Sequence, residues 1–137
     1  SNGSQIKAVP TSEDAGRSEA LSLLIVDEAA FVRNFDELWM GLYPTLSTGG
    51  RAILLSTPNG VGGQYHEIYT KSERKENEFN PIKLMWDVHP ERDDEWFNKE
   101  TKNMSKKQIS QELLCDFASS GDTFISGEVL DKLRNFP

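Results

Sequence analysis

Short apolar runs separated by polar stretches dominate the pattern of the chain. Residues 22–27 (SLLIVD) and 52–56 (AILLS) are continuous apolar runs bounded by polar or turn-forming residues. Runs of this length without strict alternation are typical of strands that are covered on both faces. We therefore predict a buried strand in each run, a third strand over residues 81–86 (PIKLMW), and a weaker one over residues 4–9, where the alternation is loose.

Apolar residues recur at helical spacing between and after these strands. The pattern predicts helices over residues 34–47, 62–75, 93–103 and 105–114. The first begins with Asn34 and Glu37, and the last with Ser105 and Gln108, and both pairs have the spacing of a capping box. Strands that alternate with helices predict an α/β fold with a mostly parallel sheet flanked by helices.

Two adjacent acids, Asp27 and Glu28, end the first buried strand. Ligands of open α/β sheets bind beyond the carboxyl ends of the strands. Four apolar residues followed by Asp-Glu form the Walker B pattern, in which the first acid holds Mg²⁺ and the second orients and deprotonates the attacking water. We therefore predict Asp27 as a Mg²⁺ ligand and Glu28 as a catalytic residue. The alternative is a strand that simply ends in exposed acids.

Two further places carry candidate chemistry. Ser56 and Thr57 end the second buried strand and precede Pro58. Hydroxyl side chains at such a position can bond a γ-phosphate and transmit its loss, although a Thr-Pro-Asn-Gly turn would also end a strand. Arg17 lies in the polar loop before the Walker B strand, where an arginine can stabilise charge on a transferring phosphate. The alternative for Arg17 is an exposed loop residue.

The composition narrows the class of protein. The 137 residues, with 36% apolar and 27% charged content, suit one soluble globular domain at most. No apolar run approaches the ~20 residues of a membrane span, and no signal-peptide pattern is visible, so we expect neither membrane insertion nor secretion. One cysteine excludes an internal disulfide and fits a reducing compartment. The net charge of −7 argues against a basic DNA clamp, so we expect DNA contacts elsewhere.

Four segments, in their order along the chain, resemble the large terminase subunit of tailed bacteriophages, the ATP-driven motor that packages DNA into procapsids. They are SNGSQIKAVPTSEDAGRSEALSLLIVDEAAFV, LLSTPNGVGGQYHEIY, NPIKLMWDVHPERD and QELLCDFASSGDTFIS, which together cover nearly the whole chain. The resemblance implies a P-loop NTPase core of the RecA-like, ASCE type. It implies that residues 1–120 are the back half of the ATPase domain, and that residues 121–137 are a connector toward a nuclease domain.

The same resemblance assigns roles to the candidate residues. Asp27 resembles the Mg²⁺-holding Walker B acid and Glu28 the catalytic glutamate, while Arg17 falls in the family's arginine-containing loop. Ser56, Thr57 and Pro58 resemble the coupling motif that links hydrolysis to domain movement. Many family members have Arg-Gly in the arginine loop, where this chain has Gly-Arg-Ser.

No phosphate-binding G-x-x-x-x-G-K-[ST] motif occurs in these residues. We expect the Walker A strand and loop to precede Ser1, so ATP and Mg²⁺ are cofactors of the complete protein and neither should bind tightly to this chain alone. This chain alone is predicted to be inactive. An interior strand that is missing also leaves unpaired edges and apolar surface, which favours association.

The resemblance also implies partners and a location. In the complete protein these are double-stranded viral DNA, the portal and procapsid, the small terminase subunit and other large-subunit copies. The location is the host bacterial cytoplasm, with transient binding at the procapsid portal. Two alternatives remain: a fragment of another P-loop translocase or helicase, and a non-catalytic interaction module whose acids are surface features.

Overall fold

The computed structural model describes residues 2–12, 19–121 and 132. The chain divides into two compact units, Ser1–Leu55 and Ser56–Pro137. No helix in the described part of the chain combines the length and the apolar character needed to cross a bilayer.

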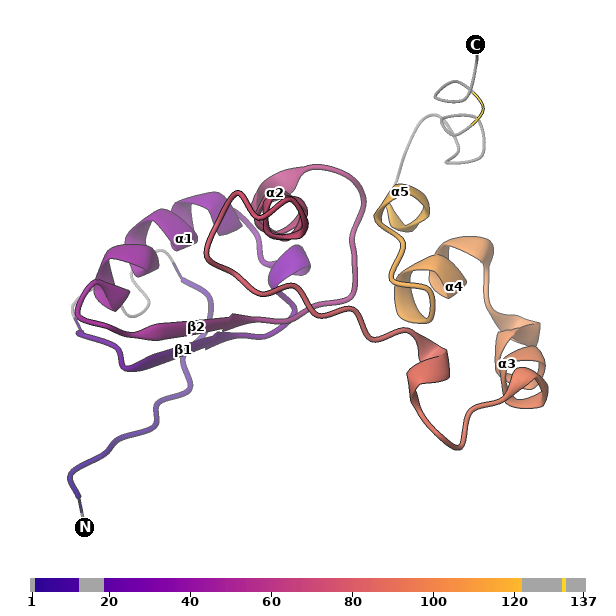
Figure 1. Cartoon of the computed structure of the whole chain (residues 1–137), viewed down its shortest axis with the longest axis horizontal. Coiled ribbons are helices and arrows are strands. Elements are labelled where there is room, and N and C mark those ends of the chain that lie inside the picture. The colour runs from indigo at the N-terminus through magenta and orange to yellow at the C-terminus, as the bar shows by residue number, and fades with distance from the viewer. Residues whose placement is uncertain (1, 13–18, 122–131, 133–137) are drawn as a thin grey trace. The chain divides into compact units, whose positions relative to one another are not determined.

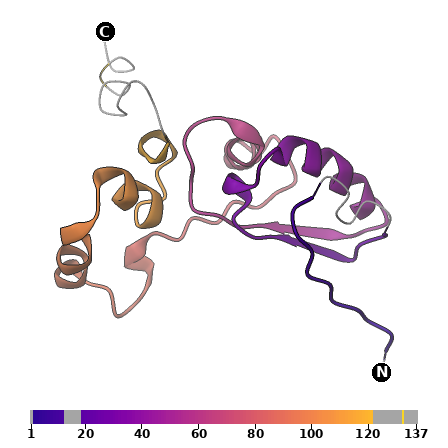
Figure 2. The same ribbon diagram turned by 180° about the vertical axis from the view of Figure 1, so that it is seen from behind.

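The first unit is built on two parallel strands joined by a helix. Strand β1 (Leu23–Val26) pairs with β2 (Arg51–Leu54) in the register Leu23 to Arg51 through Val26 to Leu54. Helix α1 (Phe35–Leu42) runs along one face of the pair (Figures 1 and 2). Parallel strands require such a crossover, usually through a helix. The strands predicted over residues 22–27 and 52–56, their parallel direction and the general α/β class are therefore confirmed.

Packing of α1 against the strands forms the core of this unit. The helix buries Phe35, Leu38, Trp39 and Leu42, whose spacing places them on one face. Burial of such side chains contributes about 1.5–3 kcal/mol each. A 3-10 helix (Tyr43–Leu46) extends α1, and the amide N–H groups of Gly49 and Gly50 both donate to the carbonyl of Leu46. The predicted helix and its glycine stop are confirmed.

The capping box predicted at the start of α1 is wrong. Asn34 occupies the N-cap position, but its backbone is left-handed (φ 53°) and its side chain makes no capping bond. A side-chain cap needs an extended backbone at this position. Instead, the carbonyl of Asn34 accepts from the amide of Glu37 at 3.1 Å. Ser105 and Gln108 form the second predicted capping box, which is confirmed.

The face of the strands opposite α1 is apolar and exposed. Ile25 is 58% exposed and Ile53 is 49% exposed, and these two residues are partners in the register. Leu23 and Leu55 on the same face are 51% and 42% exposed. We expected strands covered on both faces. Within the described residues, α1 covers one face and the other face is exposed.

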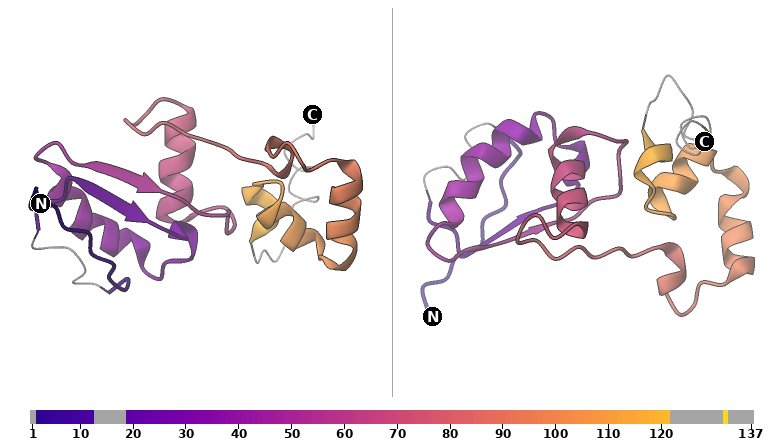
Figure 3. Two further views of the ribbon diagram at one scale, coloured as in Figure 1. Left: turned by 90° about the horizontal axis from the view of Figure 1, so that it is seen from below. Right: turned by 45° about the horizontal axis from the view of Figure 1, so that its top comes forward.

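In its described part the second unit is helical. Its α-helices are α2 (Gly63–Glu73), α3 (Asp94–Glu100), α4 (Lys106–Glu112) and α5 (Phe117–Ser120), and its 3-10 helices are Trp86–Val88 and Thr101–Asn103. A further 3-10 helix, Ala29–Phe31, belongs to the first unit. Both views in Figure 3 show α4 and α5 side by side. The predicted helices over residues 62–75, 93–103 and 105–114 are confirmed with shorter bounds, and α5 was not predicted.

Two of the predicted strands are wrong. Residues 79–85 and 2–12 have no regular secondary structure, and Ile82 and Leu84 are 69% and 67% exposed. A strand needs a neighbour that satisfies its backbone groups, and within the described residues the sheet consists of β1 and β2. Residues 81–86 therefore have the apolar pattern of a strand, but no described segment pairs with them.

Candidate functional site

The two acids lie at the carboxyl end of β1, between two residues that both form backbone hydrogen bonds with Leu55. The amide of Leu55 donates to the carbonyl of Val26 at 3.0 Å, and its carbonyl accepts from the amide of Ala29 at 3.1 Å. Asp27 and Glu28 therefore leave the strand ladder between two hydrogen bonds to the same residue. This arrangement fixes where the acids emerge from the sheet.

Glu28 has a left-handed backbone with φ 52° and ψ 39°. The amide of Glu28 donates to Oδ1 of Asp27 at 2.9 Å, and its carbonyl accepts from the amide of Phe31 at 2.8 Å. The turn ends the alternation of a strand, and both acidic residues are exposed while Ala29 is 1% exposed. A left-handed conformation costs a residue with a side chain about 1–2 kcal/mol, and such strain collects at functional sites.

The carboxylates suit Mg²⁺ that is shared with a nucleotide. The described residues contain no group of three or more metal-ligating side chains. Mg²⁺ keeps several waters and is often bound by one or two carboxylates plus substrate phosphates, so one acid at this position is a sufficient protein ligand. The two exposed carboxylates therefore suit this ion chemically.

Ser56, Thr57 and Pro58 follow β2 in the chain and belong to the second unit. Ser56 and Thr57 are half-buried and Pro58 is buried. The structure thus places the predicted acids in one unit and the predicted coupling residues in the other. Arg17 lies outside the described residues.

One known protein family matches nearly the whole chain. A family model described as "Terminase large subunit, T4likevirus-type, N-terminal" matches residues 1–132.

The chain belongs to this family.

Every candidate residue of this terminase chain lies within the matched range. The model describes the N-terminal region of the large subunit, whereas the sequence analysis specified the second half of its ATPase domain. The match supports the large subunit and its N-terminal region.

Two residues of the terminase chain that contact the loop after β2 were missed by the sequence analysis. Nε2 of Gln111 donates to the carbonyl of Pro58 at 2.9 Å. The amide of Gly60 donates to Oγ of Ser120 at 2.9 Å. Both residues fall in the segment QELLCDFASSGDTFIS, but nothing in the spacing of that segment indicates a contact more than 50 residues away.

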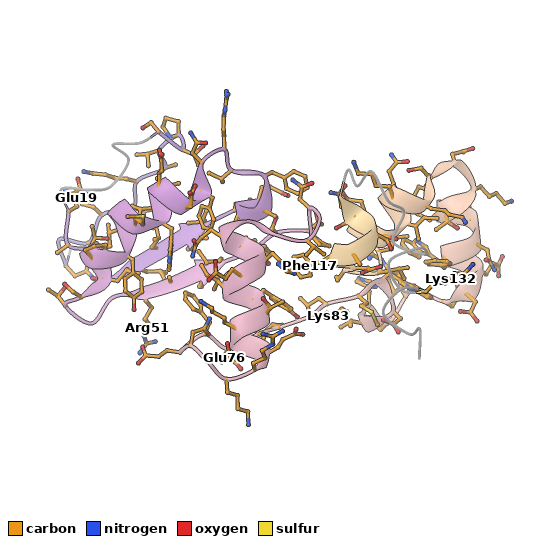
Figure 4. All side chains as sticks on the ribbon, turned by 90° about the horizontal axis from the view of Figure 1, so that it is seen from above. Glu19, Arg51, Glu76, Lys83, Phe117 and Lys132 are labelled. Atoms are coloured by element: carbon orange, nitrogen blue, oxygen red, sulfur yellow. The ribbon has the colours of Figure 1, made fainter. Side chains whose placement is uncertain are left out.

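An aromatic group on α2 surrounds Phe117, the first residue of α5 and one of the side chains labelled in Figure 4. Its ring centroid lies 6.2 Å from that of Tyr65, 4.8 Å from that of His66 and 5.4 Å from that of Tyr69. Burial raises the pKa of each of the two tyrosines and lowers the pKa of His66. Nδ1 of His66 accepts from the amide of Gly62 at 3.1 Å, so neutral His66 holds the loop before α2.

Proposed function

We propose that this chain supplies the Walker B acids and the coupling motif of the ATP-driven motor that packages viral DNA into procapsids. The observation that carries the proposal is the acid pair at the carboxyl end of β1, held by Leu55 and turned outward at Glu28. Ligands of open α/β sheets bind at this edge. Membership of the terminase large-subunit family supports viral DNA packaging as the process.

The proposed roles follow from the chemistry of each side chain. Asp27 holds Mg²⁺ when ATP is bound, because a carboxylate beside a strand end is a suitable hard ligand. Glu28 orients the attacking water and accepts its proton. Ser56, Thr57 and Pro58 respond to loss of the γ-phosphate, and Arg17 stabilises charge on the phosphate during transfer.

The proposal places residues 1–120 in the second half of a RecA-like, ASCE-type P-loop ATPase domain. Residues 121–137 form the connector toward a nuclease domain. Two observations support this placement. The acids follow strand β1, and Ser56 and Thr57 follow strand β2, its parallel partner. The 137 residues contain no phosphate-binding glycine loop, and the proposal assigns that loop to a Walker A segment outside them.

The proposed partners are those of a packaging motor. They are double-stranded viral DNA, the portal and procapsid, the small terminase subunit and other copies of the large subunit. The net charge of −7 favours DNA contacts by other parts of the protein, because cationic side chains supply most of the affinity for DNA phosphates. The proposed location is the host bacterial cytoplasm, with binding at the portal during packaging.

Glu28→Gln in the complete large subunit tests the proposal. We expect ATP turnover to fall at least about 100-fold, because a general base contributes about 10²–10⁴ in rate, while ATP binding remains. The matched control is Glu37→Gln, since Glu37 is an exposed acid on α1. Unchanged turnover in Glu28→Gln would favour a non-catalytic interaction module.

The isolated chain gives a second test. We expect it neither to bind ATP tightly nor to hydrolyse it, because it lacks a phosphate-binding loop. Equilibrium binding of a fluorescent ATP analogue and a phosphate-release assay measure these properties. Turnover by the isolated chain that survives Glu28→Gln would contradict both the assignment of Glu28 and the need for a Walker A segment.

A further inference from the structure

The loop between β2 and α2 is fastened to the C-terminal helices at two backbone positions. Gln111 of α4 donates to the carbonyl of Pro58 at 2.9 Å, and Ser120 of α5 accepts from the amide of Gly60 at 2.9 Å. The partners are 53 and 60 residues apart in the chain. All four residues belong to the second unit. The loop that begins with Ser56 and Thr57 therefore depends on distant side chains for its position.

The contact at Ser120 is closed to water. Ser120 is 0% exposed, and its hydroxyl both accepts from Gly60 and donates to the carbonyl of Phe117 at 3.0 Å. Buried hydrogen bonds of this kind are costly to break, because the freed groups have no solvent to replace the partner. Ser120 thus links the loop directly to the first residue of α5.

The backbones of Gly60 and Gly121 touch each other. A Cβ atom on Gly60 would lie 2.9 Å from the Cα of Gly121, and one on Gly121 would lie 2.5 Å from the Cα of Gly60. Gly60 also has φ 78°, a conformation that disfavours other residues. Because neither position leaves room for a side chain, the loop at Gly60 packs directly against the residue that ends α5.

Helices α4 and α5 are joined to each other as well. The amide of Asp116 donates to the carbonyl of Ser110 at 2.9 Å, and Oδ1 of Asp116 caps α5 by accepting from the amide of Ala118 at 3.0 Å. Gln111 and Ser120 therefore act from one helical pair. The loop after β2 therefore makes hydrogen bonds to both helices of this pair.

We propose that Gln111 and Ser120 are positioning residues that fasten the loop after β2 to α4 and α5 and pass its movement to the C-terminal helices. The inference rests on the proposed function, in which Ser56–Pro58 respond to phosphate loss. Neither residue touches the nucleotide in this scheme. Their effect is on how much DNA movement each hydrolysed ATP produces.

Ser120→Ala and Gln111→Leu in the complete large subunit test the inference. ATP hydrolysis and DNA packaging are measured in the same reaction with procapsids. We expect the number of ATP molecules consumed per packaged base pair to rise about threefold or more in each variant, the scale on which residues between two sites change their coupling. A residue that only supported the fold would lower both rates together and leave this ratio unchanged.

Neighbouring residues provide matched controls. Ser119→Ala removes a hydroxyl one position earlier on α5, and Glu112→Ala truncates an exposed side chain next to Gln111 on α4. We expect the wild-type ratio in both. Amide hydrogen exchange at Gly60 should accelerate in Ser120→Ala and not in Ser119→Ala, because Ser120 accepts the bond from Gly60.

The outcomes separate this inference from the proposed function. If Glu28→Gln abolishes hydrolysis while Gln111→Leu and Ser120→Ala keep the wild-type ratio, the fastening role is wrong and the proposed function stands. If Glu28→Gln leaves hydrolysis intact, both are wrong. Should Ser120→Ala fail to fold, Gln111→Leu decides alone, since Gln111 is half-buried whereas Ser120 is fully buried.

Discussion

The left-handed backbone of Glu28 leads to a prediction about two substitutions that remove the same carboxylate. Glu28→Ala and Glu28→Gly both delete the proposed catalytic group. Alanine keeps the strain of φ 52°, whereas glycine adopts this conformation without steric conflict. We therefore expect Glu28→Gly to be the more stable of two inactive variants.

The magnitude follows from two opposing effects. Relief of the left-handed conformation favours glycine over alanine by about 1–2 kcal/mol. The greater conformational entropy of glycine in the unfolded chain lowers the stability of the glycine variant by about 0.4–1 kcal/mol. The two effects together leave a gain between about 0 and 1.6 kcal/mol, and its central value of about 0.8 kcal/mol corresponds to roughly 2–3 °C in the unfolding midpoint of a domain of 150–250 residues.

Thermal unfolding of the complete large subunit, with the two variants compared under identical conditions, measures this difference. Glu37 on α1 gives a control of opposite sign, because it lies within a helix and glycine there should be less stable than alanine by about 1 kcal/mol. A Glu28→Gly variant that unfolds at or below the midpoint of Glu28→Ala would refute the reasoning about strain. ATP turnover should be lost in both Glu28 variants.

Two further predictions concern the pH response and association. Burial lowers the pKa of His66, so the folded state resists protonation that the unfolded state accepts, and stability is lost as the pH falls through this lowered pKa. Lowering the pH from about 7.5 to about 5.5 should lower the unfolding temperature of the wild type more than that of His66→Gln. An equal decrease in both proteins would exclude His66 as the cause. The isolated chain should self-associate through the exposed face that contains Ile25, and Ile25→Lys should shift sedimentation toward the monomer, whereas Met40→Lys on α1 should not. An isolated chain that is a monodisperse, cooperatively unfolding monomer would contradict this expectation.

Local pattern was sufficient for the elements of the first unit. The apolar runs before Asp27 and around Ile53 are strands, and the helix between them begins one residue after Asn34. These elements could be predicted because burial of a regularly spaced apolar face depends on neighbouring residues in the chain. The position of the acids at the end of β1 follows from the same pattern.

Patterns that depend on a distant partner were not sufficient. Residues 81–86 have the composition of a strand, but strand pairing needs a second segment, and the described residues offer none there. The capping box at Asn34 failed because the chain turns into a left-handed conformation after Val32 and Arg33, and capping geometry depends on that turn. Spacing alone does not report the backbone angle.

The two strands, the α1 face that covers them and the acids that follow β1 could be predicted from the sequence, because each depends on local spacing of apolar and charged residues. Three other features become visible only in the folded chain. These are the left-handed turn at Glu28, the grip of Leu55 on both ends of the acid pair, and the fastening of the loop by Gln111 and Ser120. The contacts of Leu55, Gln111 and Ser120 require groups from segments far apart in the chain to meet, and the turn at Glu28 depends on backbone angles that the spacing of apolar residues does not report.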